Sequence, residues 1–86
     1  MKTWSDPAWA QYIEWASQDR KTFNRINLLL KDTDRDRFDG IGKPELLKGD
    51  SSDKWSRRID EKNRLVYKPV GEDYIIYSCK GHYGDH

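Results

Sequence analysis

The sequence predicts an α+β fold in which an N-terminal hairpin of two helices packs on a small, mainly antiparallel β-sheet. Two observations support this expectation. Apolar residues recur with helical spacing up to residue 30, and three runs rich in β-branched and aromatic residues follow residue 54. Because no repeat and no linker interrupts the 86 residues, we expect one domain, residues 1–86.

The first expected elements are a short strand and a helix. Residues 2–5 form the strand, and Asp6 is the predicted N-cap of the helix, with Pro7 in its first position. The buried stripe of this helix is predicted from the spacing i, i+3, i+4 and i+7. It consists of Trp9, Tyr12, Ile13 and Ala16.

A second helix follows almost immediately. Asp19 is its predicted N-cap, and the same helical spacing assigns Phe23, Ile26 and Leu30 to its apolar stripe. Because the connection between the two helices is so short, we expect them to pack as an antiparallel hairpin.

The acidic stretch that ends the second helix resembles part of a calcium-binding loop. Asp32, Asp34 and Asp36 match the first three ligand positions of an EF-hand. The sixth position, which requires Gly, is Arg37, and the twelfth, which requires Glu, is Lys43. The sequence therefore predicts a solvated helix end and loop of mixed charge, without a metal site.

The C-terminal half is expected to form the sheet. A loop over residues 40–53 leads to strands at residues 55–59, 64–70 and 74–80. With three-residue turns between these strands, side-chain alternation puts odd-numbered residues on the face that packs on the helices. This predicted core face holds Trp55, Ile59, Leu65, Tyr67, Ile75, Tyr77 and Cys79. The opposite face is predicted to hold Ser56, Arg58, Arg64, Val66, Lys68, Ile76, Ser78, Lys80 and His82.

Basic residues of that opposite face are expected to lie together. Pairing Leu65 with Cys79 sets the register. It puts Arg64 opposite Lys80 and diagonal to His82. Like charges placed opposite one another are destabilising unless an anion lies between them, so a phosphate site is predicted there. The alternative is that this face is only the solvated side of a two-layer fold.

Composition narrows the class of protein. Hydrophobic residues make up 35% of the chain and charged residues 36%, so the core is small and depends on the 13% of residues that are aromatic. The net charge of +1 excludes strong long-range attraction to nucleic acid, but residues 54–68 carry six basic residues against two acidic ones. A lone Cys79 excludes an internal disulfide, and no signal peptide or membrane span is expected, which predicts a cytoplasmic protein.

Cleavage of RNA without a metal needs three kinds of group. A base takes the proton of the 2′-hydroxyl, a cation neutralises the phosphate oxygens, and an acid protonates the leaving 5′-oxygen. Glu, Arg and His suit these roles, because Arg binds phosphate bidentately and the reference pKa of His is about 6.5. Ordinary structural roles are the alternative: a solvated Glu45, an exposed His82, Tyr83 packed at the sheet edge, Trp55 in the core, and Arg57 or Arg58 paired with Asp60 or Glu61.

Three motifs in this order favour the catalytic interpretation. They are KPELLKG, WSRRIDEKNRLVYK and SCKGHY, and together they closely resemble the YoeB (Txe) toxins of the RelE-like superfamily from Trp4 to Tyr83. The resemblance implies a RelE-like microbial RNase fold. It also implies a toxin of a type II toxin-antitoxin pair, an mRNA interferase that enters the ribosomal A site, cuts mRNA without a metal or other cofactor, and inhibits translation.

Position within the motifs carries the family's roles over to this chain. The resemblance implies Glu45 as the general base and His82 as the general acid. Arg64 becomes the phosphate clamp that stabilises the transition state, and Tyr83 positions or stacks on a base. Gly84, Asp85 and His86 follow the His-Tyr pair and have no assigned role.

Substrate binding and partners complete the expectation. Lys48 and Arg58 match family positions that hold substrate, and Lys80 joins them through the predicted phosphate site. The implied partners are a YefM/Axe-type antitoxin, the bacterial ribosome with its mRNA, operator DNA bound together with the antitoxin, and a second copy of the chain. Two other functions fit the same basic patch: a non-catalytic RNA- or ribosome-binding module, and an operon regulator within a toxin-antitoxin pair.

Overall fold

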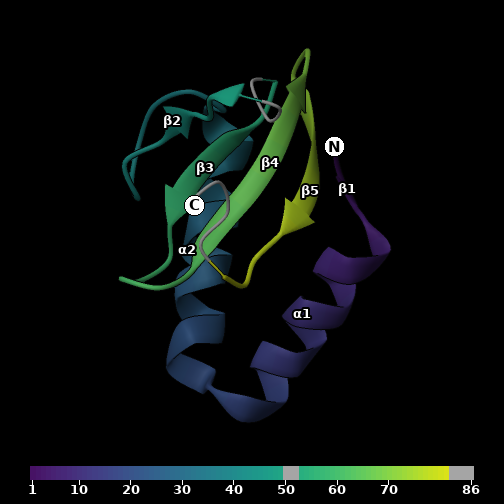
Figure 1. Ribbon diagram of the computed structural model, residues 1–86, viewed down its shortest axis with the longest axis vertical. Helices are drawn as coiled ribbons and strands as arrows, with labels where there is room; N and C mark the ends of the chain where they lie inside the picture. The colour runs from purple at the N-terminus through teal and green to yellow at the C-terminus, as the bar shows by residue number, and fades with distance from the viewer. Residues whose placement is uncertain (50–52, 82–86) are drawn as a thin grey trace.

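A computed structural model describes residues 1–49 and 53–81 of the chain. Its elements in order are β1 (Lys2–Trp4), α1 (Asp6–Gln18), α2 (Arg20–Arg35), β2 (Glu45–Leu46), β3 (Trp55–Arg58), β4 (Arg64–Val70) and β5 (Asp73–Ser78). The strands form one sheet in the order β1-β5-β4-β3-β2, antiparallel except for the parallel pair β1 and β5. The α2 helix runs behind the central strands and α1 flanks the β5 edge (Figure 1). The predicted α+β fold is confirmed.

Two faces of the sheet are distinguished below. The core face packs on the helices, and the outer face is turned toward the viewer in Figure 1. The buried apolar cluster lies between the core face and the helices and consists of Ala8, Ile26, Leu29, Leu30, Ile59, Leu65, Tyr67, Tyr74, Ile76 and Cys79. Within the described residues, no helix is both long enough and apolar enough to span a bilayer.

The helix starts agree with the sequence to within one residue. Ser5, not Asp6, is the N-cap of α1, and its Oγ accepts a hydrogen bond from the Ala8 amide at 3.2 Å. Asp6 instead occupies the first turn, where its negative charge favours the positive end of the helix dipole. Asp19 caps α2 as predicted, with its carboxylate accepting the Thr22 amide at 3.1 Å.

The predicted stripe of α1 is only partly correct, since Tyr12 packs against the core and Ala16 is half-buried, but the other two members are exposed. Trp9 and Ile13 are each 49% exposed, whereas Ala8 is fully buried and Trp15 packs against the core. The reason is that α1 packs against both α2 and β5, so its buried side is the one that lies between these two elements. In α2 the predicted Ile26 and Leu30 are buried and Leu29 and Thr33 join them, while Phe23 is only half-buried.

The predicted faces hold for β3 and β4 but not for β5. The turn between β4 and β5 has two residues instead of three, because Val70 pairs with Asp73. This one-residue difference puts Ile76 on the core face opposite Tyr67, and Ile75 on the outer face. An irregularity follows in β5, where Tyr77 is the extra residue, and it returns Cys79 to the core as predicted.

The short strand β2 was not predicted from the sequence. Its residues fall in the stretch that the sequence predicted to be loop, yet Glu45 pairs with Ser56 and Leu46 pairs with Trp55. Both β2 residues are exposed, and a two-residue edge strand has no periodicity from which to predict it. Its position follows from the neighbouring β3, which is a tertiary effect.

Candidate functional site

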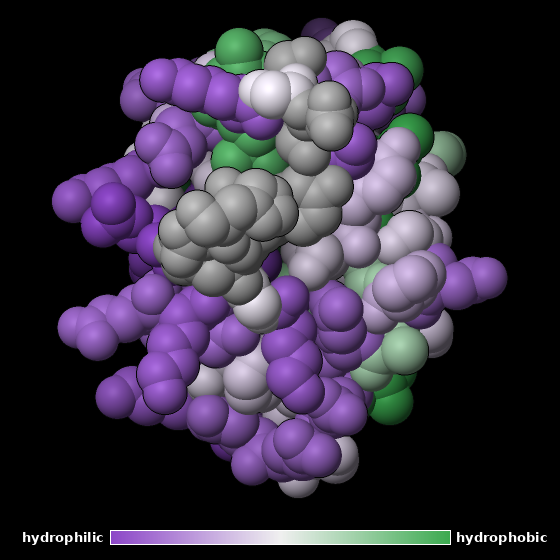
Figure 2. All heavy atoms as spheres, in the orientation of Figure 1, coloured by the Kyte–Doolittle hydropathy of each residue, from purple (hydrophilic) through white to green (hydrophobic). Residues whose placement is uncertain are grey.

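Two arginines lie directly opposite each other where β3 and β4 meet their turn. Arg58 and Arg64 form the terminal pair of this antiparallel ladder, and we call them the arginine pair. Both belong to the outer face, as the sequence predicted. They line an open groove of about 430 Å³ whose other lining residues are Arg25, Ile59, Asp60 and Glu61. In Figure 2, hydrophilic side chains dominate the left and lower parts of the face that is shown.

The groove favours an anionic ligand. Like charges placed opposite each other across a ladder repel, and an anion between them removes the repulsion. Arg58 is exposed and Arg64 is half-buried, so both guanidinium groups are near solvent. Planar guanidinium groups bind phosphate or carboxylate oxygens bidentately, which makes a phosphate a suitable occupant.

The turn after β3 holds the Arg64 side chain in place. Arg64 Nη1 donates to the carbonyl oxygens of Asp60 at 2.8 Å and Asn63 at 3.2 Å. The carboxylate of Asp60 closes the turn by accepting the amides of Lys62 and Asn63. Partial burial favours the neutral form of Asp60, but the hydrogen bonds from Asn63 and Lys62 and the charge of Arg64 outweigh it and lower the pKa of this carboxyl. The turn is therefore an ordered support for the clamp.

Helix α2 supports the other member of the arginine pair. Arg25 Nη2 donates to the carbonyl oxygen of Arg58 at 3.2 Å, which ties the end of β3 to the helix. Arg25 also lines the groove and adds a third positive charge to it. The sequence singled out no role for Arg25, and its position two residues after Phe23 carries no signal for one.

The predicted base lies on the same face of the sheet as the arginine pair. Glu45 pairs with Ser56, and alternation along β3 places Ser56 and Arg58 on one face. The Glu45 side chain is exposed, as proton transfer to a bound substrate requires. Lys48 follows β2 and is exposed, while the neighbouring Leu47 amide is fixed by the carbonyl of Lys54 at 2.8 Å.

The end of the described chain lies beside Arg64. The Arg64 amide donates to the carbonyl of Gly81 at 3.0 Å, and the Gly81 amide donates to Asn63 Oδ1 at 2.8 Å. Gly81 directly precedes His82 in the sequence. The predicted acid His82 and the predicted Tyr83 lie outside the described residues.

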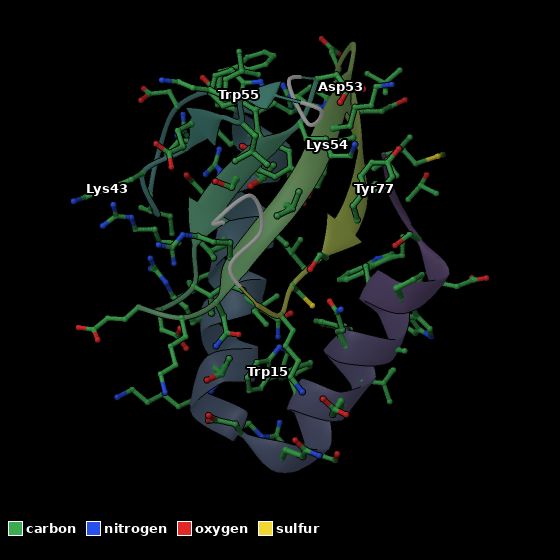
Figure 3. The ribbon with its side chains drawn as sticks, in the orientation of Figure 1. Trp15, Lys43, Asp53, Lys54, Trp55 and Tyr77 are labelled. Atoms are coloured by element: carbon green, nitrogen blue, oxygen red, sulfur yellow. The ribbon has the colours of Figure 1, made fainter. Side chains whose placement is uncertain are left out.

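Lys80 does not face Arg64 as the sequence predicted. The ladder between β4 and β5 ends at Val66 and Ser78, and the Lys80 ammonium binds the Glu14 carboxylate of α1 at 2.5 Å. It also lies 5.7 Å from the centroid of the Trp15 ring, which is labelled in Figure 3. The physical reason is that β5 ends at Ser78 and the following residue is held by α1: the Cys79 amide donates to Gln11 Oε1 at 2.7 Å, and the Cys79 carbonyl accepts Trp15 Nε1 at 2.9 Å.

A second basic cluster occupies the outer face. The ammonium of Lys54 lies 4.8 Å from the centroid of the Tyr77 ring, and Asp53 bridges Lys54 and Lys68 at 3.5 and 3.3 Å (Figure 3). The sequence predicted Tyr77 to be a core residue, whereas its half-buried ring instead supports a cation. An aromatic ring next to lysines suits contact with a nucleic acid strand.

Arg57 is the largest surprise of the site region. One alternative from the sequence was that Arg57 or Arg58 pairs with Asp60 or Glu61 on the surface, but the Arg57 side chain is fully buried and binds Asp32 at 2.7 Å. Consequently, residues 32–40 are not a freely solvated segment. The sequence did contain a signal for this burial. Arg57 shares the odd-numbered core face with Trp55, and an arginine that faces the core needs an acidic partner.

The acidic residues of this segment bind different partners. Asp32 binds Arg57, Asp34 accepts the Tyr74 hydroxyl at 2.6 Å, and Asp36 accepts the Phe38 amide at 2.8 Å. Among residues 1–49 and 53–81, no three His, Cys, Asp or Glu side chains gather as a metal site would require.

Cys79 has no features of a reactive thiol. It is fully buried, and this burial raises its pKa to about 12. A thiol of this kind is protonated at neutral pH, so it does not act as a nucleophile. The groups available for chemistry in the described part of the outer face are therefore carboxylates and cations.

Comparisons with known proteins show the family of the chain. The family described as YoeB-like toxin of bacterial type II toxin-antitoxin system matches residues 4–83. The Streptomyces coelicolor protein "Toxin YoeB" is 51% identical over 81 residues, which cover 94% of this chain and 96% of that protein.

Solved structures show the same fold. A heterotetrameric YoeB-YefM toxin-antitoxin complex from Staphylococcus aureus contains a chain with a TM-score of 0.89 and 42% identity, covering 96% of this chain and 97% of that chain. The structure of a YoeB dimer from Staphylococcus aureus gives a TM-score of 0.87 at 42% identity and covers 95% of each chain.

Proposed function

Because this chain belongs to the YoeB-like toxin family of bacterial type II toxin-antitoxin systems, we propose that it is a metal-independent endoribonuclease that cleaves mRNA in the ribosomal A site and so inhibits translation. The observation that carries the proposal is the arginine pair. Arg58 and Arg64 lie opposite each other in an open groove, on the face of the sheet that also bears Glu45.

The proposed reaction is a transfer of the phosphate to the neighbouring 2′-oxygen. Glu45 accepts the 2′-hydroxyl proton, and the resulting oxygen attacks the phosphorus. Arg64 binds the phosphate oxygens as negative charge builds on them. His82 donates a proton to the departing 5′-oxygen, so the products are a 2′,3′-cyclic phosphate and a free 5′-hydroxyl.

The remaining site residues are proposed to hold and orient the RNA. Arg58 and Lys48 contact the backbone, and Tyr83 positions or stacks on a base. Lys80 stays a predicted substrate contact, although its ammonium is bound to Glu14 in the described structure. The cluster of Lys54, Lys68 and Tyr77 extends the basic path along the outer face.

The partners are proposed from the relatives. A YefM-type antitoxin would neutralise the toxin, because YoeB is paired with YefM in the Staphylococcus aureus toxin-antitoxin complex. The toxin would also dimerise, as YoeB from Staphylococcus aureus does in the solved structure of its dimer. We also propose that the ribosome delivers the mRNA and that the toxin-antitoxin complex binds its operator DNA.

Primer-extension mapping of a defined mRNA tests the proposal. Purified wild-type protein and a His82→Ala variant, checked for folding by circular dichroism, are incubated with the mRNA with and without programmed bacterial ribosomes. The proposal expects cuts at the A-site codon only with ribosomes, and a rate in the variant lower by roughly 100- to 10,000-fold. Ribosome binding without cleavage would instead identify a non-catalytic binding module.

A further inference from the structure

We infer that Arg57 and Asp32 are positioning residues whose buried ion pair shapes the loop of residues 36–42 and thereby sets where Glu45 lies relative to the arginine pair. The inference deepens the proposed function and rests on it, because Glu45 is the base only in that reaction. Neither residue touches substrate in this scheme.

The guanidinium of Arg57 uses every donor that it has. Its Nη1 donates to Asp32 Oδ2 at 2.7 Å, and its Nε donates to Tyr67 Oη at 3.1 Å. The other acceptors are the carbonyl oxygens of Asp36, Asp39 and Ile41. An arginine has five N–H donors, so this buried group is fully satisfied, and three of its partners are backbone atoms of the loop.

Asp32 holds the same loop from the side of α2. Its Oδ2 accepts the Ile41 amide at 2.8 Å as well as Arg57, and its Oδ1 accepts Arg35 Nε at 3.1 Å. The Ile41 amide, followed by Arg57 and Arg35, lowers the pKa of Asp32 to about 2 against the opposing effect of burial. The carboxylate therefore stays ionised at neutral pH, where the ion pair holds the loop.

The loop backbone approaches the ion pair so closely that two positions require glycine. A Cβ atom on Gly40, which has a φ of 135°, would lie 1.8 Å from Asp32 Oδ2. A Cβ atom on Gly42, which has a φ of 81°, would lie 2.7 Å from Leu29 Cδ2 and 3.1 Å from Arg57 Cβ. The loop backbone therefore packs directly against the ion pair, and it cannot move inward without a clash.

The loop leads directly into the strand that carries Glu45. The carbonyl of Gly42 accepts the Arg58 amide at 2.6 Å, which ties the end of the loop to β3. Strand β2 itself has only two residues and pairs with β3 alone, too little to fix its own position. The anchored loop supplies the constraint that β2 lacks.

Strand β3 couples the loop to the arginine pair. Its consecutive residues Arg57 and Arg58 point to opposite faces of the sheet, so one strand carries the anchor of the loop on the core face and a substrate contact on the outer face. Because the β3–β4 ladder also holds Arg58 opposite Arg64, whereas β2 has only two pairs, a shift of the loop is expected to move Glu45 more than the arginine pair. Misplacement of a reacting group by about 1 Å can cost on the order of 100-fold in rate.

The test combines cleavage kinetics with amide hydrogen exchange in the full chain. The variants are Arg57→Lys, which keeps the charge but loses the fork, and Asp32→Asn. Tyr67→Phe is a milder variant for use if the first two do not fold. It removes the acceptor of Arg57 Nε and also the hydroxyl that donates to the Arg37 carbonyl of the loop at 2.7 Å. The control is Tyr74→Phe, because the buried Tyr74 hydroxyl bonds α2 at Leu30 and Asp34 instead of the loop.

The expected result separates a local effect from a global one. The rate at saturating ribosomes falls by about 10- to 100-fold in the loop variants, with little change in the half-saturating ribosome concentration, because the arginine pair is intact. The Ile41 and Phe38 amides exchange faster while the α2 amides keep their protection. The control changes protection across the molecule without this loss of rate.

Two results would overturn the inference. One is a loop variant that cuts as fast as the control at the same folded fraction. The other is faster exchange that is uniform over the chain. A wild-type protein that cuts no mRNA would overturn the proposed function instead, and exchange at Ile41 would still decide whether the ion pair holds the loop.

Discussion

The side-chain oxygen of Asn63 accepts the amide of Gly81 at 2.8 Å, so the turn between β3 and β4 holds the chain directly before His82. The same turn binds the Arg64 guanidinium through the carbonyls of Asp60 and Asn63. Two groups of the proposed reaction, the clamp and the acid, therefore depend on one turn. Helix α1 adds a second attachment, since Trp15 Nε1 donates to the carbonyl of Cys79 at 2.9 Å.

Replacing Asn63 tests this dependence. Asn63→Ala removes the acceptor of the Gly81 amide, and we expect the maximal cleavage rate to fall by about 10-fold because the acid is less well positioned. Single-turnover cleavage on programmed ribosomes measures the rate. Lys62→Ala, an exposed change in the same turn, is the matched control and should cut at the wild-type rate. Equal rates for the two variants would remove Asn63 from the positioning of the chain end.

Substitutions of the two members of the arginine pair should change different kinetic parameters. Arg64→Lys keeps the charge but loses the bidentate fork, and we expect the maximal rate to fall by roughly 100-fold. Arg58→Lys should mainly raise the half-saturating substrate concentration, because Arg58 binds substrate in the proposed reaction. Full kinetic curves for both variants measure the difference. An Arg64→Lys protein with unchanged turnover would show that Arg64 is not the clamp.

The ion pair of Asp32 with Arg57 predicts a dependence of stability on pH. The pKa of Asp32 is about 2 in the folded protein and about 3.9 in an unfolded chain, so its stabilising contribution is present above pH 4 and is lost as the pH falls toward 2. The free energy of unfolding, measured with urea between pH 7 and pH 2, should therefore differ between wild type and Asp32→Asn most at pH 7. The difference should shrink below pH 4.

A matched carboxylate controls for general acid effects. Glu72→Gln changes an exposed side chain in the β4–β5 turn. The free energy of unfolding of this variant should change with pH in parallel with that of the wild type between pH 7 and pH 2. A gap between wild type and Asp32→Asn that stays constant down to pH 2 would contradict the assignment of the ion pair.

Cys79 should be inert in the folded protein. Burial raises its pKa to about 12, so little thiolate exists at pH 8 and the sulfur is not accessible. Alkylation by iodoacetamide, followed by mass spectrometry, should be slow in the native protein and fast in denaturant. Rapid native labelling would mean that the end of β5 opens readily.

Much of the architecture was predictable because it depends on nearby residues. Asp19 caps α2 through an amide three residues away, and the bounds of β4 follow from its own composition. The faces of β3 and β4 were also predictable, because a period of two and a turn of the expected parity are local properties. That is how Arg58 and Arg64 could be assigned to one face.

Long-range contacts decided the rest. Which residues of β5 face the core depended on a two-residue turn and on an irregularity at Tyr77. The strand β2 exists only because β3 offers a free edge. Arg57 looked like its neighbour Arg58 in the sequence, and only the packing of α2 against β3 gave it Asp32 as a partner. Local sequence patterns determined the fold class, and the resemblance of three motifs to a known family supplied the proposed reacting groups, whereas burial, which depends on the whole chain, decided that Arg57 lies in the core and Arg58 on the outer face.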